Sequence, residues 1–192
     1  SVGDGLVFDP TGTRCDLLEL QEAIRAGAPA EVVRRWSGPL LEGFHLAESA
    51  EFMQWLDARR QELAAAYARA LIATADAAAG QGDAYGAVAA CRLLVAADPH
   101  SGEHARRLMS ALDAVGDRVA AIRHATEHAR RLRADLDLSP DPAVMALARE
   151  LRRTPAALAV RPSVAVLPFI SLDGTAEHEY FADGITEDVI AH

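Results

Sequence analysis

Apolar and polar residues follow each other with helical spacing along most of this chain, and the pattern repeats. Gly82-Asp83 recurs as Gly116-Asp117, 34 residues further on, and an apolar stretch with helical spacing follows each pair. A repeat of this length is typical of helical hairpins that stack, because one hairpin cannot bury its apolar face alone. The pattern therefore predicts an all-α array of antiparallel helical hairpins, with a curved surface left free for a partner.

Local start and stop signals divide the array into separate helices. Asp16 opens a first helix that Gly27 and Pro29 end, and Ser49 is suited to cap a helix of about thirty residues. Ser101 is suited to cap a later one. The predicted helices cover residues 16–26, 30–36, 50–80, 83–97, 102–115, 117–136 and 142–153. Short turns in the repeat region make neighbouring helices antiparallel.

Two apolar features before the repeat predict buried packing. The loop over residues 37–46 is expected to fold beneath the helices as a plug, because it carries Leu40, Leu41, Phe44 and Leu46. An active-site lid is the alternative, although no catalytic group lies nearby. The long helix carries a stripe that predicts core rather than a cofactor site, formed by Phe52, Trp55, Leu56, Leu63, Tyr67, Ala70 and Leu71. Truncation of Trp55 is then expected to cost several kcal/mol.

The two ends of the chain follow other patterns. Residues 5–9 predict a short strand, which is either the tail of a preceding domain or an arm on the helices; a lone strand is unstable, which favours the first. Residues 154–162 are typical of a linker, and the continuous apolar run 163–169 predicts a strand buried on both faces of an α/β sheet. We expect a piece of a longer protein, divided into residues 1–13, 14–153, 154–162 and 163–192.

Charge and cysteine content narrow the class of function. The net charge is −9, which argues against nucleic-acid binding by these residues, so DNA contact is expected only through a domain outside this chain. Cys15 and Cys91 fall in no metal or disulfide spacing, which favours a reducing, cytoplasmic setting. No apolar run is long enough for a membrane span, and we expect no membrane partner.

No group of residues predicts catalysis, a cofactor or a metal. The sequence contains no GxSxG motif, Walker A loop or Rossmann fingerprint. His100/His104 and His124/His128 each place two imidazoles on one helix face, but nothing completes a metal site, so solvated or capping histidines are the favoured interpretation. The acidic residues between Asp173 and Asp188 fit no calcium loop, and a solvated acidic surface is favoured.

Within the repeat, small, large and proline positions resemble the tetratricopeptide pattern. The matching residues of the first copy are Ala87, Cys91, Leu94 and Pro99. The second copy is degenerate, without the proline or the central aromatic, and its matching residues are Ala121, Ala125, His128 and Arg133. The resemblance implies a tetratricopeptide-like hairpin array.

A wider set of motifs resembles the bacterial transcriptional activator domain of regulators similar to the Streptomyces antibiotic regulatory proteins. The motifs lie at residues 36–43, 55–63, 98–99, 103–112 and 136–142, with Asp137 where such proteins usually have glycine. The resemblance covers residues 14–153. Residues 162–169 and 179–188 resemble the opening of a TolB-like amino-terminal domain.

This resemblance implies a non-enzymatic module that mediates regulatory contacts between proteins. In that family a winged-helix DNA-binding domain precedes the helical domain, so it would lie before Ser1. The implied partners are a second copy or the transcription machinery. The alternative function is an adaptor in an adenylate cyclase-type signalling protein.

Six side chains form the candidate partner-binding set. If the repeats stack, the concave side presents Arg69, Ile72 and Asp76 from one helix, and Glu103, Arg106 and Ser110 from the next. Arginine binds carboxylates through two hydrogen bonds, so an acidic segment is a conceivable ligand. The alternative, which the sequence favours, is that the arginines only solvate the surface or pair with neighbouring acids.

Overall fold

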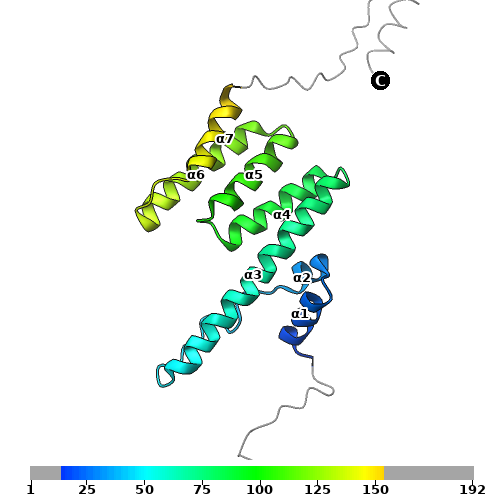
Figure 1. Cartoon of the computed structure of the whole chain (residues 1–192), viewed down its shortest axis with the longest axis vertical. Helices are drawn as coiled ribbons and strands as arrows, with labels where there is room; N and C mark the ends of the chain where they lie inside the picture. Colours follow the sequence, from blue (N-terminus) through cyan, green and yellow to red (C-terminus); the bar gives the residue numbers. More distant parts are fainter. Residues whose placement is uncertain (1–13, 154–192) are drawn as a thin grey trace, which may run out of the picture. The chain divides into compact units, whose positions relative to one another are not determined.

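The computed structural model describes residues 14–153, and every regular element in this range is an α-helix (Figure 1). The helices are α1 (Asp16–Arg25), α2 (Pro29–Arg35), α3 (Ala50–Gly80), α4 (Ala84–Ala97), α5 (Gly102–Ala114), α6 (Arg118–Leu136) and α7 (Pro142–Arg153). None of these helices combines the length and the apolar character needed to cross a bilayer. The all-α prediction is confirmed for this range. The predicted strand at 5–9, linker and C-terminal α/β segment lie outside the described residues.

Side-chain caps begin the longer helices where the sequence predicted them. The Ser49 Oγ accepts a hydrogen bond from the Phe52 N–H at 3.3 Å, and the Ser101 Oγ accepts one from the His104 N–H at the same distance. Asp117 caps α6 in the same way, by accepting from the Ala120 N–H at 3.0 Å. Each such cap stabilises its helix by about 1 kcal/mol.

The two glycine-aspartate pairs form the same corner. Gly82 and Gly116 have φ angles of +80° and +81°, which favour glycine because a Cβ is strained there. The Asp83 N–H donates to the Ala78 carbonyl at 2.9 Å, and the Asp117 N–H donates to the Leu112 carbonyl at 2.9 Å. These bonds satisfy carbonyls at the ends of α3 and α5. The 34-residue repeat is therefore a repeat of local geometry.

A third corner of this kind ends α6 without a glycine. Asp137 has φ +52° and ψ +34°, and the Leu138 N–H donates to the Leu132 carbonyl at 3.2 Å. Aspartate tolerates the left-handed region better than most residues but less well than glycine. Aspartate thus forms the left-handed cap at the end of α6.

Consecutive helices pack against each other, and α5 also contacts α7. The largest core cluster joins α3 to α7 through buried residues that include Cys91, Met109, Ala121 and Val144. A smaller cluster joins α1, α2 and the middle of α3. The Trp36 ring stacks on Tyr67 with centroids 4.5 Å apart, which closes the loop after α2 against α3.

The N-terminal half of α3 corrects two predictions. Trp55 is 54% exposed, and Leu41, Phe44 and Leu46 are exposed as well, so the buried plug and the buried Trp55 are wrong. Only Leu40 of the loop packs against a core cluster. The reason is length: α3 has 31 residues and α4 has 14, so half of α3 extends beyond its main partner (Figure 1).

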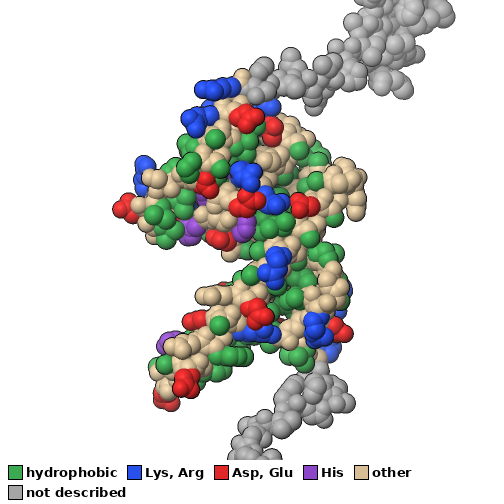
Figure 2. All heavy atoms as spheres, viewed as in Figure 1, with side chains coloured by type: hydrophobic (Ala, Val, Ile, Leu, Met, Phe, Trp, Pro, Cys, Tyr) green, Lys and Arg blue, Asp and Glu red, His purple; other side chains and the backbone are tan. Residues whose placement is uncertain are grey.

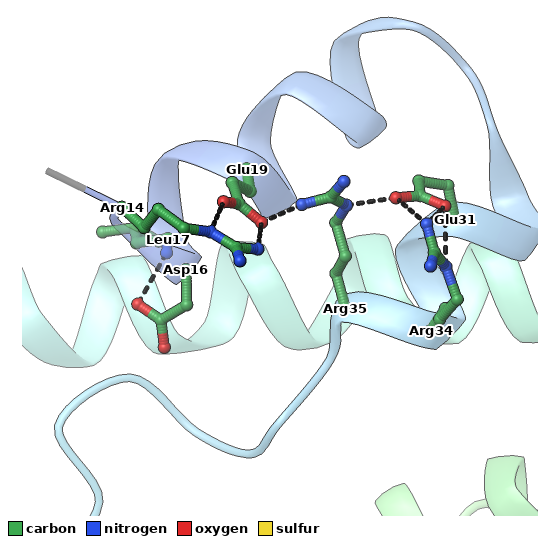
Figure 3. A network of polar contacts seen from close by, with 7 residues as sticks. All are labelled: Arg14, Asp16, Leu17, Glu19, Glu31, Arg34 and Arg35. Atoms are coloured by element: carbon green, nitrogen blue, oxygen red, sulfur yellow. Dashed lines mark hydrogen bonds and ion pairs between the residues drawn. The ribbon is translucent and has the colours of Figure 1, made fainter. Parts of the chain in front are cut away.

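A row of ion pairs ties α1 to α2 (Figure 3). Arg14 Nε lies 3.1 Å from Glu19 Oε1, Arg34 Nε lies 2.9 Å from Glu31 Oε2, and Arg35 contacts both carboxylates. Hydrogen bonding, chiefly from Arg14 and Arg34, lowers the pKa of Glu19 and Glu31. Glu19 and Glu31 remain 30% and 28% exposed, so water screens the network, and it orders the two helices more than it stabilises them.

Candidate protein-binding groove

A groove of about 480 Å³ lies between α3, α4 and α5, and four of the six predicted side chains line it. They are Asp76 from α3 and Glu103, Arg106 and Ser110 from α5. We call this hollow the α3–α5 groove. Figure 2 shows basic and acidic side chains next to each other over α5.

Small side chains open the groove. Six alanines line it, at positions Ala75, Ala79, Ala84, Ala87, Ala111 and Ala114, together with Gly82. A methyl group fills little of the space between neighbouring helices, so room for another side chain remains between them. The thiol of Cys91 also lines the groove, and burial raises its pKa. The floor is therefore apolar and uncharged.

The charges of the groove pair with one another. Arg106 Nη2 lies 2.5 Å from Glu103 Oε2, and Arg107 Nε lies 2.9 Å from Glu103 Oε1. The same Arg107 reaches across to α3, where its Nη1 lies 3.1 Å from Asp76 Oδ1. Hydrogen bonding from Arg106 is the main cause of the lowered pKa of Glu103. A ligand carboxylate would therefore compete with Glu103 and Asp76 for the two guanidinium groups.

Arg69 and Ile72 lie outside this groove. Arg69 is exposed and lines two smaller hollows against α1 and α2. Ile72 is half-buried and packs against the cluster of Tyr67, Leu71 and Leu94. Although both share a helical face with Asp76, the neighbour of that face changes from α2 to α5 along α3.

Sequence reasoning missed Arg107 as a contact between α3 and α5. Its position four residues after Glu103 predicts an ion pair within the helix, which the structure contains. The second bond, to Asp76, joins residues 31 positions apart, so no local spacing could have revealed it.

The histidines of the two predicted pairs make contacts away from the groove. His100 Nε2 lies 2.9 Å from Asp135 Oδ2, and His128 Nδ1 lies 3.2 Å from the Pro99 carbonyl. His128 is 2% exposed, so the solvated interpretation is wrong for this residue. Burial lowers the pKa of His124. Within residues 14–153 no cluster of three or more His, Cys, Asp or Glu side chains is arranged to hold a metal ion.

Comparison with known proteins gives one partial match and one family. A segment of 36 residues is 58% identical to a protein described as putative adenylate cyclase 3 of Rhizobium meliloti (strain 1021), and the match covers 19% of this chain and 6% of that protein. No solved structure matches the chain significantly. The model of the bacterial transcriptional activator domain matches residues 15–152, so the chain belongs to this family.

Proposed function

We propose that residues 14–153 act as a regulatory module that binds proteins and catalyses no reaction, within a cytoplasmic bacterial transcription regulator. DNA would be contacted through a separate domain of the parent protein. The family supports the regulatory role. The observation that carries the proposal is the α3–α5 groove, lined by Asp76, Glu103, Arg106 and Ser110.

We further propose that the helices form tetratricopeptide-like hairpins, with α3 paired to α4 and α5 paired to α6. Contacts between these pairs support the assignment, as do the matching corners at Gly82 and Gly116. The contact of α5 with α7 agrees with stacking of successive first helices. In such an array, the first helices of neighbouring hairpins line the surface that a partner occupies.

The chemistry of the groove suits a short segment with an apolar side chain and a carboxylate. The alanine floor accepts an apolar group, and burial of that group there provides most of the affinity. A ligand carboxylate would take over hydrogen bonds that Arg106 now gives to Glu103. The segment belongs either to a second copy or to the transcription machinery.

The groove can be tested by filling it. Ala114→Trp places a large ring into the groove from an exposed position, and Arg106→Glu reverses one charge at its edge. Both variants are expected to weaken binding at least about tenfold, as measured by sedimentation for self-association and by two-hybrid pairing with RNA polymerase subunits. Ala96→Trp is the matched control, because Ala96 is exposed on α4 and does not line the groove.

Two results would contradict the proposal. One is an unchanged set of interactions in both groove variants. The other is an equal loss in Ala96→Trp, which would show that any added ring disturbs the module. If Arg106→Glu weakens binding but also lowers the melting temperature, the loss of binding could come from misfolding. Arg106→Gln is then measured as well, because it removes the charge without reversing it.

The partial match to an adenylate cyclase supports one alternative, an adaptor region in a cyclase-type signalling protein. The chain spans only 6% of that relative, so the cyclase activity is not transferred to it. Sequencing the parent gene separates the alternatives. A winged-helix domain in the parent protein supports the transcriptional role, and a cyclase domain supports the adaptor.

A further inference from the structure

The N-terminal end of α3 carries an apolar surface that no described helix covers. We call it the aromatic patch; its members are Leu41, Phe44, Leu46, Phe52 and Trp55. The rings touch in series, with centroids 6.0 Å apart between Phe44 and Phe52 and 5.5 Å apart between Phe52 and Trp55. Figure 2 shows hydrophobic side chains beside acidic ones at this end of α3. Exposed apolar groups that gather in this way mark interaction surfaces.

Specific hydrogen bonds hold the loop that supplies three of the five members of the patch. Arg60 Nε donates to the Leu40 carbonyl at 2.7 Å, and Arg60 Nη2 donates to the Leu41 carbonyl. The Phe44 N–H donates to the Leu41 carbonyl at 3.0 Å, and the Leu46 N–H contacts Met53 Sδ at 3.4 Å. The loop is therefore anchored to α3, while Leu41, Phe44 and Leu46 stay exposed.

The backbone of Leu41 supplies an independent observation. Its φ of +48° lies in the left-handed region, which leucine enters less readily than glycine or asparagine. The side chain is nevertheless 49% exposed, so burial does not repay this conformation. Strained backbone that the core does not require gathers at functional sites. We take the strain as a sign that the outward side chain of Leu41 is used in recognition.

Charge indicates which partner the patch suits. Glu42, Glu48 and Glu51 lie in the same segment and are exposed, and within residues 14–153 none of them takes part in an ion pair. The nearby Asp57 and Glu62 differ, because they pair with Arg60 and Arg59. A partner that brings cations to the patch therefore gains electrostatic attraction.

The same charges disfavour other occupants. A second copy docked patch to patch would bring the three unpaired glutamates of each molecule toward those of the other. A nucleic-acid backbone or an anionic lipid surface would meet like charge as well.

We propose that the aromatic patch docks an amphipathic segment of another protein, in which arginine or lysine flanks a row of apolar side chains. Apolar anchors spaced at i, i+3, i+4 and i+7 on a helix would cover the three rings, while cations beside them reach Glu42, Glu48 and Glu51. This site is separate from the α3–α5 groove, so either proposal can fail alone.

Fluorescence anisotropy with two synthetic peptides tests the proposal on the whole chain. One labelled amphipathic peptide carries leucines at helical spacing flanked by arginines, and the second carries glutamates in place of the arginines. The arginine peptide is expected to bind, with its affinity falling as salt rises. The glutamate peptide is expected to bind at least about tenfold more weakly. Equal binding of the two peptides, or no binding of either, would overturn the proposal.

Single-residue variants distinguish a role of the patch in binding from a role in folding. Trp55→Ala is expected to weaken binding of the arginine peptide about thirtyfold, as truncation of an aromatic anchor does. Tyr85→Ala is the matched control, because Tyr85 is an aromatic residue of α4 that is 76% exposed and lies outside the patch. The triple variant Glu42→Gln, Glu48→Gln, Glu51→Gln is expected to weaken binding and to flatten its dependence on salt. Equal losses in Trp55→Ala and Tyr85→Ala would contradict the assignment.

Leu41→Asn distinguishes recognition from packing. Asparagine tolerates the left-handed backbone, so the thermal midpoint is expected to stay the same or rise while affinity for the arginine peptide falls. A lowered midpoint would show that Leu41 serves the fold, and the recognition role would be withdrawn. Sedimentation tests for self-association through the patch. If the chain forms a dimer that Trp55→Ala abolishes and binds neither peptide, the patch is a self-association surface instead.

Discussion

The apolar stripe of α3 follows one continuous helix, yet Leu71 near its C-terminal end is buried while Trp55 near its N-terminal end is exposed. Leu71 is fully buried in a cluster with Leu94 of α4, whereas Trp55, about four turns earlier, is 54% exposed. A helical stripe shows which face of a helix is apolar. It does not show whether another element reaches that face. Leu71 therefore supports the fold, whereas Trp55 belongs to a surface.

The largest expected effect tests this difference directly. Leu71→Ala is expected to lower the free energy of unfolding by about 2–5 kcal/mol, because it leaves a cavity between α3 and α4. Trp55→Ala removes a larger side chain but is expected to cost less than about 1 kcal/mol, because water already reaches the ring. Urea denaturation at a common temperature measures both. Similar costs for the two variants would show that Trp55 is packed in solution.

A smaller effect compares a glycine with left-handed backbone, Gly116, with a glycine in helical backbone, Gly80. Gly116→Ala is expected to cost about 1–2 kcal/mol, because alanine is strained at the φ of +81°. Gly80→Ala is the matched control: Gly80 is helical, and neither added Cβ meets an atom within 4 Å. It is expected to be neutral or to stabilise by up to about 1 kcal/mol. If Gly80→Ala lowers the free energy of unfolding as much as Gly116→Ala does, the cost does not come from the left-handed backbone.

The smallest effect concerns the ion pairs that join α1 to α2 beside the middle of α3. Arg14 and Arg34 hold the pKa values of Glu19 and Glu31 below the ordinary 4.5. A lowered pKa in the folded state stabilises the fold above the unfolded value, and this contribution is lost as pH falls through the folded value.

The double variant Glu19→Gln, Glu31→Gln is therefore expected to lose part of the drop in stability below pH 4.5. Both carboxylates are partly exposed, so the change in slope is expected to be small and to shrink further at high salt. Thermal melts over a pH series, at low and at high salt, provide the measurement. An unchanged slope would mean that the network in Figure 3 does not persist in solution.

Much of the fold could be predicted from local sequence, because the signals act within one helical turn. Ser49 and Ser101 cap helices by reaching the N–H three residues later, and the corners at Gly82 and Gly116 need only a residue that tolerates positive φ. Asp137 forms a similar corner at the end of α6, although aspartate tolerates positive φ less well than glycine. The exposure of Trp55 could not be predicted in this way. It depends on where α4 ends in space, which no local pattern records.

The same distinction between local and long-range signals applies to the residues of the candidate site. Asp76, Glu103 and Arg106 are brought to one groove because helical spacing and the repeat together predict facing positions. Arg69 shares the face of Asp76 and still lies elsewhere, because the neighbour of α3 changes along its length. The contact from Arg107 to Asp76 escaped prediction for the same reason.

Photo-crosslinking from the α3–α5 groove tests the central claim most directly. A benzoylphenylalanine at position 114, in the parent regulator inside cells, is expected to crosslink to a protein, and Arg106→Glu is expected to abolish that crosslink. The same probe at position 96, outside the groove, is expected to give no such product. Equal crosslinking from both positions, or none from position 114, would contradict the assignment of the groove as the protein-binding site.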